Sequence, residues 1–145
     1  MKKTLILIIS ILICVMVILF VFLRNVESNE RKMQNINLEY EEYLNKNIYG
    51  TDVGTIINKV VNHNEKNKVE KDKKGIYINN NSTSIKIDIY IKENDTTYSM
   101  ENIYKLGTSE FIKNFNTIIF KGKVEEYHKN TGQISKIIFE QVDQD

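Results

Sequence analysis

The chain has 145 residues, with 20 Lys and Arg against 19 Asp and Glu and a formal net charge of +1. Lys2, Lys3 and Arg24 flank an apolar N-terminal segment, so the remainder holds 20 − 3 = 17 basic against 19 acidic residues. Nucleic-acid-binding domains usually show a basic excess with clustered arginines. The composition therefore argues against nucleic acid as a partner, and about 120 remaining residues suffice for one domain.

The N-terminal segment is apolar from residue 5 to residue 23 except at Ser10 and Cys14. At about 1.5 Å per residue, such a helix crosses a hydrocarbon layer of roughly 30 Å. A cleaved signal peptide is the alternative, because Lys2 and Lys3 form a basic start. The run exceeds the usual apolar length of a signal, however, and residues 24–27 offer no small-x-small cleavage site. We therefore expect residues 1–24 to form an uncleaved single-pass membrane anchor.

The orientation of this anchor depends on a nearly balanced set of charges. Lys2, Lys3 and the terminal amine face Arg24, Arg31 and Lys32 across the span. The N-terminal side holds more positive charge next to the membrane, and long domains translocate largely regardless of charge. We expect the N-terminus in the cytoplasm and the remaining chain outside the cell membrane.

Residues 25–48 are predicted to form an amphipathic helix, continuous with the anchor because no proline interrupts it. Apolar residues recur there at helical spacing: Met33, Ile36, Tyr40, Tyr43 and Leu44. This stripe is expected to pack within its own domain, and the alternative is that it binds a partner. Gly50 is expected to end the helix, and Thr51 or Asp52 to cap a second helix that reaches about Asn64. The predicted core stripe of that helix is Val53, Ile56, Ile57, Val60 and Val61.

The rest of the chain is predicted to form mainly strands. A polar stretch over 62–75 predicts a helix end and a loop, followed by strands at 76–78 and 85–91. Residues 98–106 fit a helix or a strand, and a short helix is expected from Thr108 or Ser109. Two final strands, 118–127 and 134–142, are joined by a turn at 128–133. This order predicts an α+β fold in which residues 49–145 form a small domain with an antiparallel sheet ending in a hairpin. Lys86, Asp88, Tyr90 and Lys92 are expected on the face opposite the apolar residues Ile85, Ile87, Ile89 and Ile91.

No residue pattern in the sequence indicates a catalytic, cofactor-binding or metal site. His63 and His128 are the only histidines and lack zinc-site spacing, so we expect a solvated or helix-capping His63 and a turn residue at His128. Gly50 to Gly54 lacks the preceding strand of a dinucleotide loop. The pairs Glu41-Glu42 and Glu125-Glu126 are neighbours that point apart, and the eight tyrosines are expected mainly in packing roles. The single cysteine, Cys14, leaves no disulfide to form within the chain. We therefore predict no enzyme activity and no cofactor.

Two stretches of the sequence are similar to a known family. They are NIYGTDVGTIINK at 47–59, and YHKNTG at 127–132 leading into IFEQ at 138–141. They resemble an uncharacterised family of short clostridial single-span membrane proteins. The resemblance implies an anchor plus a domain and brings no activity or site residues. An abundance of Ile, Lys and Asn also indicates an AT-rich bacterial genome.

The order of an apolar helix, an amphipathic helix and a sheet is also similar to type IV pilins. The pilin leader motif is missing, because no Gly follows Lys2-Lys3-Thr4 and no acid lies within 5–23. The sequence thus predicts a non-enzymatic structural or interaction module of the bacterial envelope, accessory to a pilus-like or secretion assembly. Its expected partners are the membrane and other envelope proteins. The alternative function is an extracytoplasmic ligand-binding or sensing domain.

Overall fold

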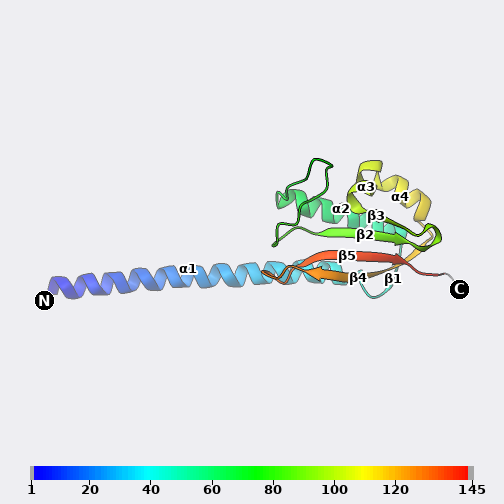
Figure 1. Cartoon of the computed structure of the whole chain (residues 1–145). Helices are drawn as coiled ribbons and strands as arrows, with labels where there is room; N and C mark the ends of the chain where they lie inside the picture. The colour runs from blue at the N-terminus through cyan, green and yellow to red at the C-terminus, as the bar shows by residue number, and fades with distance from the viewer. Residues whose placement is uncertain (1, 144–145) are drawn as a thin grey trace. The chain divides into compact units, whose positions relative to one another are not determined.

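In the computed structural model, helix α1 spans Lys2–Glu41 (Figure 1). The structure describes residues 2–143 and divides the chain into two compact units, Met1–Asn35 and Ile36–Asp145. In the first unit, every side chain from residue 5 to residue 23 is exposed. This helix is long and apolar enough to cross a membrane, which confirms that part of the prediction.

The second unit begins with the last residues of α1. The helix ends at Glu41 rather than near residue 48, because residues 47–49 form a strand instead. Tyr40 and Leu44 are nevertheless buried in the core, and Ile36 and Tyr43 pack against it. The expectation that this stripe packs within its own domain is therefore confirmed for these four residues.

A five-stranded sheet forms one layer of the second unit. Its strands lie in the order β1 (Asn47–Tyr49), β4 (Ile119–Tyr127), β5 (Ile134–Gln141), β2 (Lys86–Ile91) and β3 (Thr96–Ser99). The α+β class and the β4–β5 hairpin are confirmed. The sheet is mixed rather than wholly antiparallel, since β2 pairs in parallel with β5, Ile87 opposite Ile137. The chain between these two strands is long enough for the crossover that parallel pairing requires.

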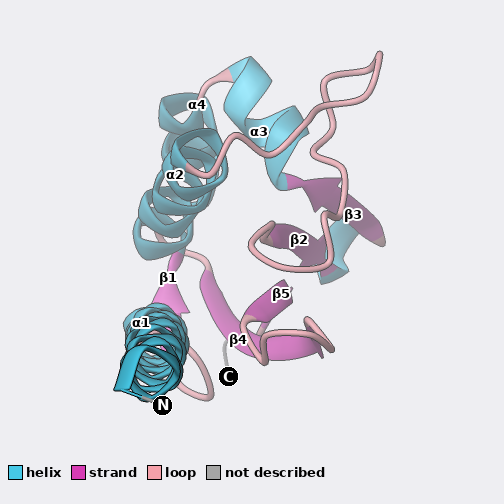
Figure 2. Ribbon diagram, turned by 90° about the vertical axis from the view of Figure 1, so that its left-hand side faces the viewer, coloured by secondary structure: helices cyan, strands magenta, loops and turns pink. Residues whose placement is uncertain are grey.

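Three helices cover one face of the sheet: α2 (Gly50–Lys66), α3 (Met100–Leu106) and α4 (Thr108–Phe115), as Figures 1 and 2 show. A short 3-10 turn, η1 (Lys92–Asn94), precedes β3. Gly50 starts α2 and does not end a preceding helix. The N-cap residue is Tyr49 rather than Thr51 or Asp52, and the Asp52 carboxylate contributes the return bond of a capping box by accepting the Tyr49 backbone N–H at 3.2 Å.

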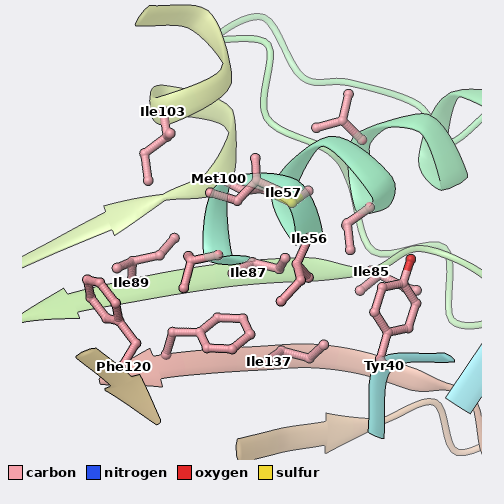
Figure 3. Close-up of a cluster of buried hydrophobic side chains, with 14 of the residues drawn as sticks. Tyr40, Ile56, Ile57, Ile85, Ile87, Ile89, Met100, Ile103, Phe120 and Ile137 are labelled. Atoms are coloured by element: carbon pink, nitrogen blue, oxygen red, sulfur yellow. The ribbon is translucent and has the colours of Figure 1, made fainter. Parts of the chain in front are cut away.

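The core lies between these helices and the sheet (Figure 3). All five predicted residues of the α2 stripe are buried, as are the four alternating isoleucines that end at Ile91. Each fully buried isoleucine contributes roughly 2 kcal/mol through loss of apolar surface to water. On the opposite face, Lys136 Nζ lies 3.0 Å from Asp88 and 2.8 Å from Glu125, so that face carries ion pairs.

The predicted strand at 76–78 is wrong. Tyr77 makes only an isolated bridge with Lys71, and the segment between them closes into a turn. Asp72 Oδ1 accepts hydrogen bonds from the N–H groups of Lys74 at 2.8 Å and Ile76 at 2.9 Å. This local bonding replaces pairing with the sheet, as aspartate side chains often do in turns.

Gly50 provides a test of how closely α2 and α4 approach. A Cβ at this position would overlap the Phe115 carbonyl, which is backbone and cannot easily move. We expect Gly50→Ala to lower the free energy of unfolding by about 1 to 3 kcal/mol, measured by urea denaturation. Thr51→Ala, at the exposed next position, is the control and should change stability by less than about 0.5 kcal/mol. Equal stability of the two variants would contradict the close approach.

Candidate functional site

A pocket of about 350 Å³ lies where the 71–77 turn meets helices α2 and α3. We call it the Tyr77 pocket. It is lined by Val61, Lys71, Lys74, Gly75, Tyr77, Glu101, Asn102, Tyr104 and Lys105. Val61 comes from the core stripe of α2, and the last four residues come from α3. The pocket therefore combines an apolar residue of the core with polar side chains from two other segments.

The turn that forms one wall is fixed at both ends. The Asp72 side chain holds the tip through its two backbone hydrogen bonds, and these bonds lower the pKa of that carboxyl. The Ile78 N–H donates to the Glu70 carbonyl at 2.8 Å. Glu101 Oε1 accepts the Tyr77 N–H at 3.2 Å, which ties the turn to α3. The wall is thus positioned by hydrogen bonds from its own residues and from α3.

The pocket has an excess of positive charge. Three lysines line it, Lys71, Lys74 and Lys105, against the single acid Glu101. The Lys71 ammonium lies 4.5 Å from the centre of the Tyr77 ring and 3.6 Å from Glu65 Oε1. Its contact with Tyr77 raises the pKa of Lys71. Lys71 therefore keeps its charge at neutral pH, and the three lysines together give the pocket a lining that favours an anion.

The Tyr77 side chain is unusual for a buried tyrosine. Only 2% of its surface is exposed, and its hydroxyl is the only buried side-chain polar atom in residues 2–143 without a hydrogen-bond partner. Burial raises the pKa of this hydroxyl, and Lys71 opposes that shift. An unpaired buried hydroxyl costs stability, so it needs a structural or functional explanation.

The chemistry available to the pocket is binding of an anion. Three ammonium groups supply donors and the exposed Tyr104 ring supplies apolar surface, while Val61 and the Tyr77 hydroxyl lie buried behind them. Across residues 2–143 no group of three or more His, Cys, Asp and Glu side chains gathers at one point. The sequence did not predict this pocket, because Tyr77 was assigned to a strand. The cluster Lys71 to Gly75 was the available signal.

A second polar cluster surrounds residues 83–85 and includes both histidines. His63 Nε2 lies 2.9 Å from the Thr83 carbonyl, and His128 Nε2 lies 2.7 Å from the Ser84 carbonyl. Gln133 also donates to the Thr83 carbonyl, at 3.0 Å. His63 is half-buried rather than solvated, because the chain before β2 folds back over it. His128 lies at the hairpin turn as expected, and it is buried there.

Asn64 is the residue of this cluster that the sequence analysis missed. Its side chain is fully buried, and its amide both donates to the Ile85 carbonyl at 2.7 Å and accepts the Ile85 N–H at 2.9 Å. Asn64 lies four positions after Val60, on the same face of α2. That spacing was the signal that could have identified it as buried.

The other candidates from the sequence have ordinary structural positions. Glu41, Glu42 and Glu126 are exposed, and Glu125 is paired with Lys136. Tyr40 and Tyr77 confirm the packing expectation, whereas Tyr49, Tyr104 and Tyr127 are exposed. Tyr77 and Tyr104 line the same pocket.

Burial of His63 makes stability depend on pH. Burial lowers the pKa of its imidazole and outweighs the Thr83 hydrogen bond and nearby Glu39, which raise it; Lys66 lowers it further. In the unfolded chain His63 has the ordinary pKa of about 6.5 and therefore binds a proton more readily than in the folded domain. The contribution of His63 to stability is full above a pH of about 6.5 and is lost as the pH falls from there through the folded pKa. We expect His63→Gln to flatten this loss in urea denaturation at successive pH values. Parallel stability curves for the two proteins would contradict this.

The unpaired hydroxyl of Tyr77 predicts a stabilising substitution. Tyr77→Phe keeps the ring in the core and under Lys71 but removes a buried donor. We expect the free energy of unfolding to rise by on the order of 1 kcal/mol, measured by urea denaturation. Tyr127→Phe, at an exposed position, is the control and should leave stability unchanged. Destabilisation by Tyr77→Phe would mean that the hydroxyl has a partner in the folded protein.

Comparison of this chain with protein-family models, with curated proteins and with solved structures found no match in any of the three.

Proposed function

We propose that this chain is a non-enzymatic interaction module of the bacterial envelope, held in the cell membrane by α1. The N-terminus lies in the cytoplasm and Ile36–Asp145 lies outside. The module contributes contacts to a pilus-like or secretion assembly. The observation that carries the proposal is the fully exposed apolar surface of residues 5–23, which water solvates poorly and lipid can cover.

The second unit supports a binding role more than a purely anchoring one. Its core is built from its own elements, since α2, α3, α4, the end of α1 and strands β1, β2, β4 and β5 all supply buried residues. Exposed apolar side chains remain at Ile78, Tyr104 and Leu106, on the segments that border the Tyr77 pocket. Apolar residues gathered on an otherwise polar surface often mark a contact site.

The second candidate function, an extracytoplasmic ligand-binding domain, is favoured by the Tyr77 pocket itself. Ligand sites are concave and combine apolar walls with a few polar groups. The Tyr77 pocket has this composition and a volume at the lower end of the range for ligand sites, with Val61 and Tyr104 beside three lysines. The two candidates share the membrane anchor and differ only in what the outer domain binds.

The single native cysteine allows the orientation to be tested. In a Cys14→Ser background, Lys113→Cys places a thiol on the exposed surface of α4 and Thr4→Cys places one before the span. We expect an impermeant maleimide to label position 113 in wall-stripped cells and position 4 only after permeabilisation. Both proteins should remain in the membrane pellet after a carbonate wash.

Two outcomes would overturn this assignment. Labelling of position 4 alone in intact cells would place the domain in the cytoplasm. Release of a shortened soluble protein would show that residues 5–23 belong to a cleaved signal and not to an anchor.

A further inference from the structure

We propose that the Tyr77 pocket binds the phosphate group of a small organic phosphate. Lys71, Lys74 and Lys105 provide the positive charge, and Tyr104 and Val61 contact the organic part. The inference deepens the second candidate function, because it rests on binding by the outer domain. It does not depend on the orientation of the anchor.

The lysines of the pocket outnumber its one lining acid, Glu101, although Glu65 pairs with Lys71 and the Asp72 carboxylate interacts with Lys74 from the turn. Within residues 2–143, neither Lys74 nor Lys105 takes part in an ion pair, and the Lys71 contact with Glu65 is long at 3.6 Å. Glu101, the one acid in the lining, accepts the Tyr77 N–H, so three lysines share a single carboxylate. Mutual repulsion among three ammonium groups is relieved when an anion enters, so the empty pocket is electrostatically prepared for one.

Phosphate matches these groups better than a carboxylate does. A phosphomonoester carries about −1.5 to −2 charges at neutral pH and three acceptor oxygens, whereas a carboxylate has one charge and two oxygens. Lysine binds phosphate as a point charge and does not require the bidentate geometry of arginine. Three lysines around one pocket therefore fit a group with several oxygens pointing in different directions.

Tyr77 supplies an additional donor. Its hydroxyl is buried and makes no hydrogen bond in the structure, and the Lys71 ammonium lies 4.5 Å from the centre of the ring and interacts with the side chain. A phosphate that draws the exposed Lys71 side chain off the ring uncovers the hydroxyl and gives it an acceptor. Ligand binding thus satisfies the buried polar atom that the folded domain leaves unpaired.

The size of the pocket and its apolar residues limit the ligand. A volume of about 350 Å³ is at the lower end for small-molecule sites. The Tyr104 ring is 46% exposed and lies at the pocket, where it can cover an aromatic or aliphatic group. A lipid headgroup carries the same phosphate chemistry, so the test includes both sources.

The test is isothermal titration of the full-length protein in neutral detergent micelles at low salt. The probes are inorganic phosphate, phenyl phosphate and, in a separate arm, micelles doped with short-chain phosphatidylglycerol. We expect phenyl phosphate to bind more tightly than inorganic phosphate, and binding to weaken as salt is added. Lys74→Gln combined with Lys105→Gln should weaken phenyl phosphate binding by about tenfold or more.

Two further variants separate binding from folding. Tyr77→Phe should keep the fold and weaken phenyl phosphate binding severalfold, while Lys113→Gln, on the surface of α4, should bind as the unaltered protein does. Phosphatidylglycerol binding alone, lost in the double variant, would support the site with lipid as the source. Absence of binding to all probes, or equal loss in Lys113→Gln, would overturn the proposal. Either result would leave the labelling test of the anchor unaffected.

Discussion

The paired hydrogen bonds between the Asn64 amide and the Ile85 backbone fix the position at which β2 enters the sheet. β2 pairs with β5 in parallel, so no hairpin turn sets its register. A shift by one residue would turn every buried isoleucine of β2 toward solvent. Asn64 prevents that shift from α2, the helix on which those isoleucines pack. His63 and His128 hydrogen-bond the carbonyls of Thr83 and Ser84, which precede Ile85. Residues 83–85 are therefore held from α2 and from the turn between β4 and β5.

The elements that the sequence predicted are those with a strong local period. The apolar helix, the α2 stripe, the alternation from Ile85 to Ile91 and the final hairpin all follow from side-chain spacing. The parallel β2–β5 pairing does not, because alternation gives a strand two faces but no direction. The end of α1 at Glu41 was also missed, since Tyr43 and Leu44 keep helical spacing although they reach the core from a turn.

The Tyr77 pocket could not be predicted from local patterns. Its residues come from α2, the 71–77 turn and α3, and only the fold brings them together. Tyr77 lies between two isoleucines, which reads as a strand, yet the Asp72 side chain satisfies the backbone locally and keeps this segment out of the sheet. The lysines of the turn resembled ordinary solvated residues, because charge in a sequence does not show which neighbours will compensate it.

Stability alone does not account for a tyrosine at position 77. A phenylalanine would fill the same volume, keep its ring under the Lys71 ammonium and place no donor in the core, so the hydroxyl is expected to lower the stability of the domain by on the order of 1 kcal/mol. The three lysines around it face one acid in the pocket lining, Glu101, so their mutual repulsion is only partly offset. The anion binding that we propose would give the hydroxyl an acceptor and the lysines a negative charge in one event. Residues that lower the stability of the unliganded fold, and whose cost a bound ligand would remove, are typical of binding sites.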